Sequence, residues 1–456
     1  MKRECCKRIE YRRYLNRTSG LLRVSEEAYQ KSSGTDADVA GMYVLWPVLF
    51  AFLCHVLERA RATGCFRLYF LARDGWLMKK MAEKICGIEK IQMECRYLYA
   101  SRYAWRIPEH HLIGQKCLER ICRGGMDVSF ARLMERAGLT EEEGHRIAAL
   151  IHLPQSYISP LSWKEIQELR QPLSECREFM ELVSRRSREQ YEAAVSYLEQ
   201  EALLEPVPFA VVDSGWIGTM QESLQNLLDS MGWKGKVQGF YFGLYNLPEG
   251  AEEKNYDAFY FAPPSGARKK AHFSNCLFEC IFSAPHGMTQ GYTCRQNMEP
   301  VLGKPEQINV NKTKVQERLL EIWLDVLEKN WHPNLWKEAR TLDIRPLLES
   351  FMSRPSKEEV RWYGGYLFSD ELTGEGRQPL ALPLTKMELL KQQLPFRLWF
   401  MLGPGRHGIK ESGWLEGSIR LYGGSLHTLY RAGAVFYKYL LYLRMQHRFR
   451  AGRKAA

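Results

Sequence analysis

FAVVDSGWIGT, residues 209–219, is the stretch that decides the fold of this chain. Its apolar first half predicts a buried strand that ends in Asp213, and Gly215 and Gly218 predict a tight loop before a helix that begins near Thr219. Strand, glycine-bearing loop and helix in this order are typical of α/β proteins that bind phosphate with loop amides and a helix N-terminus. We therefore expect a site for a phosphorylated ribose at this loop.

A second stretch, FRLYFLARDG at residues 66–75, repeats the design. Residues 68–71 predict a buried strand, residues 72–75 its exit loop and residues 76–86 the following helix, while residues 95–99 predict a neighbouring strand. Because ligands of open parallel sheets bind at the carboxyl ends of the strands, both loops are expected to meet at one ligand.

The remaining pattern predicts an α/β fold with a parallel, Rossmann-like core, a large helical insertion and a C-terminal helical region. An apolar run at 43–57 is too short to span a bilayer and predicts a buried helix, and 237–245 predicts another strand. The expected divisions are an extension at 1–40, an α/β domain at 41–303 with a helical insertion at about 106–204 that could form a lid or a hood for an acceptor, and a helical region with a basic tail at 304–456.

Composition limits the classes of partner. The 456 residues are 45% apolar and 12% aromatic, which excludes a disordered chain, and the net charge of +11 favours polyphosphate, acidic lipid or nucleic acid. No nucleic-acid recognition motif accompanies the charge, so we expect no nucleic-acid partner. Twelve scattered cysteines indicate reduced thiols, and residues 1–23 lack an apolar signal core, so a cytoplasmic protein is expected.

The loop after residue 212 offers groups for a phosphorylated sugar. Gly215 and Gly218 let backbone amides approach a phosphate closely, and Asp213 can accept hydrogen bonds from ribose hydroxyls. The alternative is structural, because Thr219 and Glu222 have the spacing of a capping box.

The loop after residue 71 offers a cation and an acid. Arg73 suits a bidentate contact with diphosphate, and Asp74 could hold Mg²⁺, orient a ribose or act as a base, unless it only caps the helix that follows. Ser101 and Arg102, after the neighbouring strand, offer a hydroxyl and a second cation, with a surface arginine as the alternative.

Two further segments attract attention. Glu279 stands in an apolar run at 277–282, where a carboxylate is usually paired or functional, and His286 follows with a structural role as the alternative. Residues 431–454 carry seven Lys or Arg and no acid, interleaved with aromatic residues, which predicts either a helix that lies on an anionic membrane or a core helix with a basic tail.

These segments resemble a known family. The loop around Asp213 is similar to the phosphoribosyl-diphosphate loop of type I phosphoribosyltransferases, although Ser214 stands where that family usually has a second acid. A closer resemblance is to the phosphoribosyltransferase-like module that accompanies HAD-type phosphatases in bacterial polysaccharide gene clusters. The matching positions are 70–75, 99–102, 212–221 and, more loosely, 279–292.

The resemblance implies transfer of 5-phosphoribose from phosphoribosyl diphosphate to a sugar hydroxyl of a glycan, lipid-linked as bacterial glycans usually are, followed by removal of the 5-phosphate by a separate HAD phosphatase. Asp36-Ala37-Asp38 has the acid spacing of a HAD nucleophile, but no predicted strand precedes it, so the phosphatase is expected to be another chain. We expect catalysis by Arg73, Asp74 and Glu279, Mg²⁺ at Asp74, and substrate binding by Asp213, Ser214, Gly215, Trp216, Gly218, Thr219, Ser101, Arg102 and His286.

Two other functions fit the same residues. Asp74 and Asp213 could bind Mg²⁺ in a phosphatase or hydrolase, although neither loop has the Asp-x-Asp of a HAD nucleophile. A non-catalytic scaffold that binds nucleotides or lipid head groups through the basic tail is the third reading.

Overall fold

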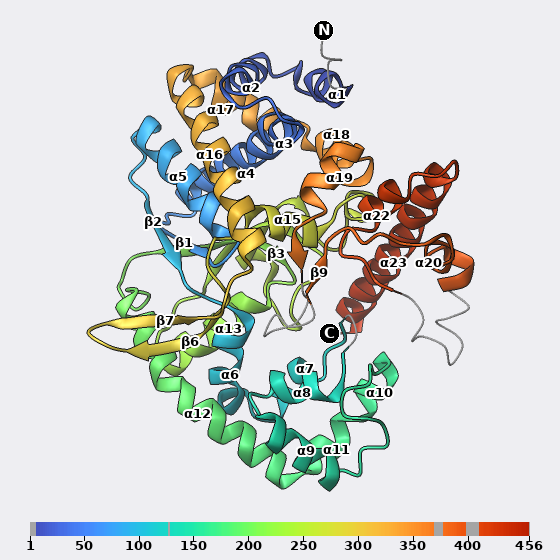
Figure 1. The fold of residues 1–456 in the computed structure, drawn as a ribbon. Helices are drawn as coiled ribbons and strands as arrows, with labels where there is room; N and C mark the ends of the chain where they lie inside the picture. The colour runs from blue at the N-terminus through green and yellow to red at the C-terminus, as the bar shows by residue number, and fades with distance from the viewer. Residues whose placement is uncertain (1–5, 126–127, 369–376, 398–409, 456) are drawn as a thin grey trace.

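Five parallel strands form the central sheet of the computed structural model, which describes residues 6–125, 128–368, 377–397 and 410–455 (Figure 1). The strands lie in the order β2-β1-β3-β4-β5, and every neighbouring pair is parallel. Their bounds are β1 Arg67–Leu71, β2 Glu94–Leu98, β3 Phe209–Trp216, β4 Gln238–Leu244 and β5 Tyr256–Phe261. The predicted α/β class with a parallel sheet is confirmed.

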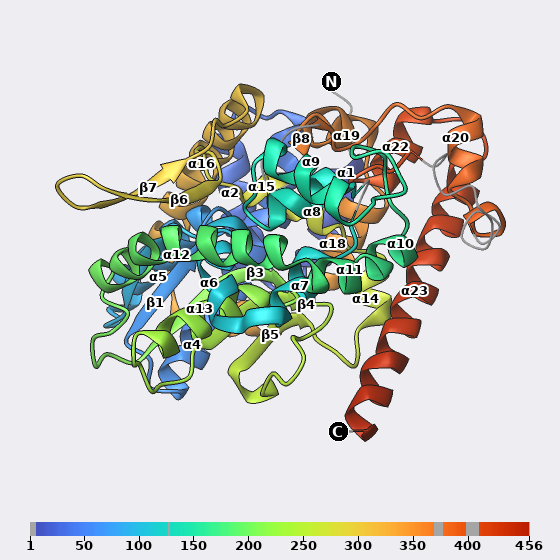
Figure 2. The ribbon, with the colours of Figure 1, turned by 90° about the horizontal axis from the view of Figure 1, so that it is seen from below.

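Helices cover both faces of this sheet, which is why its strands are continuously apolar. Leu68 and Phe70 pack into one core with α4 (Trp46–Ala62) and α5 (Gly75–Glu89). Tyr69 and Leu71, which alternate with them, pack into a second core with α6 (Arg102–Ile113), α12 (Arg177–Gln200) and α13 (Thr219–Ser230). Figures 1 and 2 show the two helical layers on either side of the strands.

The two ends of the chain share the first of these cores. Helices α1 (Cys6–Leu15), α2 (Ser19–Lys31) and α3 (Asp36–Ala40) pack against α16 (Gln307–Lys329), α17 (Pro333–Thr341), α18 (Ile344–Leu348) and α19 (Lys357–Tyr363). Tyr11 donates a hydrogen bond to Glu359 Oε1 at 2.5 Å, and Lys7 donates one to Ser350 Oγ at 2.6 Å. Residues from both terminal regions thus complete the core that supports the sheet (Figure 1).

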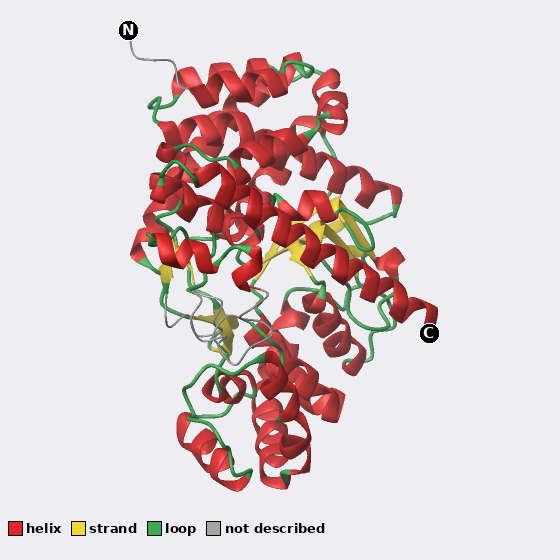
Figure 3. Cartoon of the chain, turned by 90° about the vertical axis from the view of Figure 1, so that its right-hand side faces the viewer, coloured by secondary structure: helices red, strands yellow, loops and turns green. Residues whose placement is uncertain are grey.

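The helical insertion has a core of its own. Helices α7 (Cys117–Ile121), α8 (Phe130–Arg136), α9 (Glu141–Leu150), α10 (Trp163–Glu168) and α11 (Arg170–Glu175) enclose it together with the start of α12. These helices form the lower part of the molecule in Figure 3. The insertion is therefore a separately packed lobe joined to the sheet through α6 and α12.

The smaller elements complete the described chain. An antiparallel hairpin of β6 and β7 packs on α12, and η1 continues directly into α4. The remaining bounds are η1 Gly41–Leu45, η2 Gly114–Lys116, η3 Glu253–Asn255, α14 Ala267–Ala271, α15 Asn275–Phe282, β6 Thr289–Cys294, β7 Met298–Leu302, η4 Glu349–Ser353, β8 Leu367–Phe368, β9 Gln378–Pro379, α20 Lys386–Lys391, α22 Leu415–Tyr422 and α23 His427–Ala455.

Most sequence predictions of these elements are confirmed. The strands expected at 68–71, 95–99 and 237–245 lie within one residue or two of β1, β2 and β4. The stretch Ala37–Ala62 is the one helix in the described residues that is long and apolar enough to cross a membrane, and 94% of its apolar window is buried inside the protein. Asp36-Ala37-Asp38 begins helix α3, where Asp38 forms a capping box with Thr35, so no strand delivers this acid pair. Every described cysteine is a free thiol.

The prediction that β3 ends in Asp213 is wrong. The strand continues to Trp216, because Asp213, Gly215 and Trp216 pair with β4. Only Ile217 and Gly218 then separate β3 from α13.

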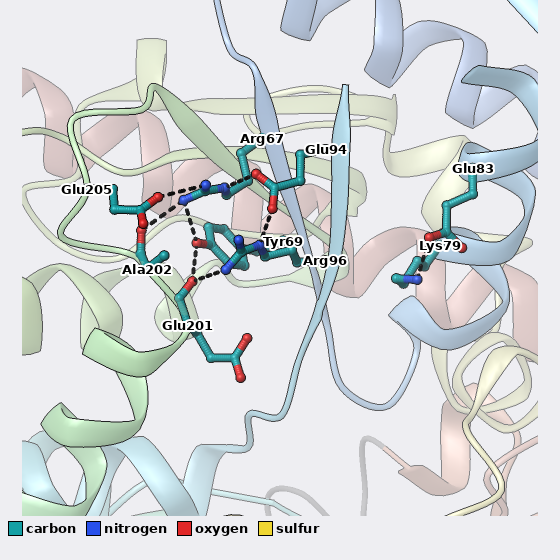
Figure 4. Close-up of polar contacts among 9 residues, drawn as sticks. All are labelled: Arg67, Tyr69, Lys79, Glu83, Glu94, Arg96, Glu201, Ala202 and Glu205. Carbon is teal, nitrogen blue, oxygen red and sulfur yellow. Dashed lines mark hydrogen bonds and ion pairs between the residues drawn. The ribbon is translucent and has the colours of Figure 1, made fainter. Parts of the chain in front are cut away.

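A buried arginine connects the amino-terminal ends of strands β1 and β2 to the end of the helical insertion (Figure 4). Arg67 on β1 is 5% exposed and forms ion pairs with Glu94 at 2.5 Å and Glu205 at 2.8 Å. It also donates to the Ala202 carbonyl at 3.0 Å. Ala202 and Glu205 belong to the segment that connects α12 to β3, so their contacts with Arg67 position the start of β3 in the sheet.

We expect Arg67→Met to lower the free energy of unfolding by about 2–4 kcal/mol, since the charge-assisted hydrogen bonds of a buried guanidinium are lost. Lys79→Ala is the control, because Lys79 forms a surface pair with Glu83 at 2.6 Å (Figure 4) and should cost about 0.5 kcal/mol or less. Thermal and urea unfolding of both variants measures the difference. Equal losses in the two variants would contradict this role for Arg67.

Candidate functional site

The two predicted loops meet where β1 and β3 lie side by side. Pairing between these strands stops at Phe70 and Val212, and β1 ends one residue later at Leu71, so residues 214–216 of β3 extend beyond the end of β1. The loop at 72–75 lies against this extension, and Ser214 Oγ donates a hydrogen bond to Asp74 Oδ2. In the order 2-1-3-4-5 the winding of the chain reverses between β1 and β3, which is where open α/β sheets bind ligands.

The two glycines have structural reasons of their own. Gly215 has a φ of +104°, and a Cβ there would lie 2.6 Å from the Gly243 carbonyl oxygen of β4. Gly218 has a φ of +71°, and a Cβ there would lie 2.6 Å from the ring of Tyr256. The glycine-bearing loop expected between Asp213 and Thr219 is therefore a strand end and a two-residue connection, and the donors left for an anion are the first-turn amides of α13.

The structural alternatives for Asp74 and Thr219 fail on geometry. Asp74 occupies the N-cap position of α5, but its carboxylate makes no capping bond and accepts from Ser214 instead. Helix α13 begins at Thr219 with Gly218 as its N-cap, and no side chain caps it. Glu222 pairs with Arg120 at 3.1 Å, so the expected capping box is not formed.

Asp74 and Asp213 are half-buried carboxyl groups close enough to affect each other. Burial is the main cause that raises the pKa of Asp74 to about 7, the charge of Asp213 adds to it, and the Ser214 hydrogen bond with Arg73 and Arg102 opposes it. Burial likewise raises the pKa of Asp213 to about 7, against the amides of Ser214 and Gly215. The pair therefore takes up or releases a proton near neutral pH, as a general acid or base must.

A third carboxylate reaches the pair from α15. Glu279 Oε1 accepts a hydrogen bond of 2.5 Å from Trp216 Nε1, and the charge of Glu279 contributes to the raised pKa of Asp213. Trp216 holds a φ of +77°, a costly conformation for a residue with a side chain, and its ring packs against Phe273 and Phe278. The strained end of β3 thus sets the position of Glu279.

Arginines surround these acids. Arg73 and Arg102 are exposed, and the charge of each lowers the pKa of Asp74. The peptide bond before Arg73 is cis, and the Arg73 carbonyl accepts from the Ala284 amide at 3.1 Å, which holds the loop beside the segment after α15. Both predicted clamps therefore lie beside the carboxylates.

Arg106 is the site residue that the sequence analysis missed. Its Nη2 donates to Thr219 Oγ1 at 2.7 Å, and its Nε is buried with no hydrogen-bond partner among the described residues. Burial lowers the pKa of Arg106 well below its usual range, and the neighbouring Arg102 and Arg123 lower it further. Cations crowded at the N-terminus of α13 would be stabilised by an anion. The signal was the spacing of Arg102 and Arg106, which is one helical turn after the Ser101 cap.

Two expected substrate ligands instead hold the scaffold. The Ser101 hydroxyl accepts from the Ala104 amide at 2.9 Å as the N-cap of α6 and donates to the Thr289 carbonyl at 2.5 Å. Both ring nitrogens of His286 have partners, the Gly287 carbonyl and the Tyr97 hydroxyl, each at 2.8 Å. His286 therefore lies at the site as a support for Tyr97, and burial lowers its pKa.

The acids could take part in a metal site. Within residues 6–125, 128–368, 377–397 and 410–455, no three His, Cys, Asp or Glu side chains gather closely enough to hold a metal ion by themselves. Mg²⁺ is commonly held by one or two carboxylates together with substrate phosphates and water. Asp74 and Asp213, whose pKa values are raised chiefly by burial, fit that mode of binding, because a cation would favour their charged forms.

Comparison with known proteins adds no assignment. No protein-family model matches this sequence, and no curated protein matches it.

We expect Asp74→Asn to stabilise the protein, and more so at pH 8 than at pH 5. The pKa of Asp74 is the ordinary 3.8 in the unfolded chain and about 7 in the folded protein. As pH rises from about 4 to about 7, the unfolded chain loses the Asp74 proton before the folded protein does, so the free energy of unfolding falls. The advantage of the variant should grow by about 2 kcal/mol from pH 5 to pH 8. Thermal unfolding of the variant, of the wild type and of the exposed control Asp325→Asn at both pH values measures it. A pH-independent difference would contradict the raised pKa.

We expect Arg106→Gln to weaken binding of ribose 5-phosphate about tenfold or more, because one charge-assisted contact to its phosphate is lost. The matched control is Arg188→Gln on the exposed face of α12, which should bind as the wild type does. Calorimetry at low salt measures both affinities. An unchanged affinity in Arg106→Gln would place the anion elsewhere.

Proposed function

We propose that this protein is a glycan phosphoribosyltransferase. It transfers 5-phosphoribose from phosphoribosyl diphosphate to a sugar hydroxyl and releases diphosphate. One observation carries the proposal. The hydrogen bond from Ser214 to Asp74 joins the two strand-end loops at the point where the winding of the sheet reverses, and it brings Arg73 and Asp213 to the same place.

The charges around the site support this chemistry. The C1–O bond of the donor breaks with its electron pair passing to diphosphate, while the acceptor hydroxyl forms the new bond to C1. Arg73 and Arg102 would bind the departing diphosphate, and Arg106 with the first turn of α13 would bind the 5-phosphate. Backside attack gives inversion to a β-ribofuranoside.

The acids divide the remaining work. Asp213 would hold the ribose hydroxyls, and either Asp74 or Glu279 would take the proton of the acceptor hydroxyl. The raised pKa of Asp74 supports it as a base that works near neutral pH, and Trp216 orients Glu279. Mg²⁺, bound through Asp74 and the diphosphate, would offset the negative charge of the leaving group.

The proposal extends to partners and place. The acceptor is a lipid-linked glycan of bacterial polysaccharide biosynthesis, a separate HAD phosphatase removes the 5-phosphate, and no nucleic acid takes part. The protein acts in the cytoplasm, with contact to the inner face of the cell membrane through the basic tail of α23. The supports are the net charge of +11 and exposed apolar side chains along that helix, such as Leu429 and Phe436.

Incubation with phosphoribosyl diphosphate, Mg²⁺ and a panel of glycans tests the function. We expect diphosphate release and an acceptor that gains one phosphoribosyl group. Asp74→Asn should lower kcat about 10²-fold or more, as loss of a general base does, whereas Asp325→Asn should retain full activity. In the wild type kcat/KM should rise with pH towards about 7, because the Asp74–Asp213 pair must lose a proton.

Two outcomes would overturn the proposal. One is the absence of turnover and of phosphoribosyl diphosphate binding across a broad acceptor panel. The other is release of inorganic phosphate from simple phosphoesters, abolished by Asp74→Asn, which would make the adjacent carboxylates of Asp74 and Asp213 the centre of a Mg²⁺-dependent phosphatase.

A further inference from the structure

A cavity of about 460 Å³ lies between α14 and α23, away from the acids of the candidate site. Its apolar wall comes from Ala271, Val435, Phe436 and Tyr439. Figure 2 shows α23 running along the outside of the molecule, with its last turns extending past the other helices. An apolar hollow beside an external helix is accessible to a ligand from outside.

The charge in this cavity is one-sided. Arg268, Arg354 and Arg431 line it, together with His272, and no acid does. Within the described part of the chain neither Arg268 nor Arg431 forms an ion pair, while Arg354 reaches Glu10 at 3.6 Å. Burial lowers the pKa of Arg431, and the charges of Arg354 and Arg420 lower it further. These guanidiniums repel one another, so an anion placed among them would be stabilised.

A second cavity, of about 330 Å³, adjoins the first. The two share Ser353, Arg354 and Arg431, so these two arginines stand at the junction. Its two acids lie among several cations: Glu10 pairs with Lys7 at 3.1 Å and lies 3.6 Å from Arg354, while Glu416 pairs with Lys438 at 2.6 Å and its charge raises the pKa of Arg431. The acids of the second cavity therefore offset only part of the positive charge, because five cationic side chains line the two cavities against two acids: Lys7, Arg268, Arg354, Arg420 and Arg431 against Glu10 and Glu416.

The residues of α23 in the first cavity share one face of the helix. Arg431, Val435 and Tyr439 are four residues apart, so the positive end and the apolar wall follow each other along the helix. Five of the exposed large apolar side chains in the described residues lie on this one helix, and such clusters mark interaction surfaces: Leu429, Phe436, Tyr439, Leu440 and Leu441. Basic and apolar groups combined on an external helix are typical of contact with a membrane surface.

We propose that the two joined cavities bind a lipid phosphate. Its phosphate lies between Arg354 and Arg431, and its apolar chain lies along Val435, Phe436 and Tyr439. The apolar wall favours a lipid over a soluble anion, and the excess of cations over acids favours an anionic head group over a neutral one. This inference does not depend on the proposed transferase activity.

The site has a route to the candidate active site. Tyr442 follows Tyr439 by one turn, and its ring stacks on Tyr245 with centroids 5.2 Å apart. Tyr245 in turn packs on Trp216, the residue that holds Glu279, with centroids 5.7 Å apart. A lipid that changes the position of α23 would therefore also affect the position of Trp216 at the end of β3.

Binding of decyl phosphate to the full chain, in the absence of phosphoribosyl diphosphate, tests the site. Calorimetry should give an affinity at least tenfold tighter for decyl phosphate than for inorganic phosphate or decanol. Arg431→Gln and Phe436→Ser should each weaken binding about tenfold, whereas Arg444→Gln and Leu441→Ser, on the same helix but outside the cavity lining, should stay within twofold of the wild type. Circular dichroism checks that all four variants are folded.

A vesicle assay identifies the source of the ligand. Flotation with vesicles containing phosphatidic acid should fall for Arg431→Gln and Phe436→Ser more than for their controls. Equal loss in all four variants would replace the site with diffuse attraction to the surface, and equal affinity for inorganic phosphate would make it a site for a soluble anion. Either result overturns the inference. Turnover of Arg431→Gln with a soluble acceptor, measured separately, should equal that of the wild type, so failure of the transferase proposal is distinguishable from failure of this one.

Discussion

Strand β3 extends beyond its neighbour β1, and the hydrogen bond from Ser214 to Asp74 joins this extension to the loop that follows β1. Without a strand partner on that side, the end of β3 needs the loop after β1 to pack against it. The loop brings Asp74 beside Asp213, and the strained Trp216 brings Glu279 to the same place. The candidate site is thus a consequence of unequal strand lengths at a reversal of winding.

The electrostatics of this region differ from those of the structural ion pairs elsewhere in the protein. Arg67 is an example of a structural ion pair in this protein, because its guanidinium has two carboxylates and a carbonyl as partners (Figure 4). At the other end of the sheet the carboxyl groups of Asp74 and Asp213 have raised pKa values, and Arg106 has an unpartnered Nε. Carboxyl groups whose pKa values burial raises, and an arginine with an unpartnered buried Nε, are groups that a ligand carrying phosphates and a cation would stabilise.

The terminal regions of the chain explain why this arrangement can be held. Helices from both ends pack into one core with α4 and α5 behind the sheet, while the insertion keeps a separate core. The strained and charged groups at the ends of β1 and β3 therefore follow directly on strands that are packed into a continuous buried core. Helix α23 contributes Arg431 to a second, positively charged cavity, and its Tyr442 stacks on Tyr245, which packs on Trp216 at the end of β3.

Local pattern in the sequence was enough for the elements that neighbours along the chain determine. Continuous apolar runs specified β1, β2 and β4, and the acids at 74 and 213 marked the strands whose ends meet. The length of β3 was decided by backbone pairing with β4, which no pattern within β3 reveals. Arg106 donates a hydrogen bond to Thr219, which lies 113 positions later in the sequence. The partners of Ser101 and His286, the Thr289 carbonyl and the Tyr97 hydroxyl, lie more than 180 positions away from them. Such partners depend on how helices and strands pack in three dimensions, whereas periodicity reports only contacts within a turn or a strand.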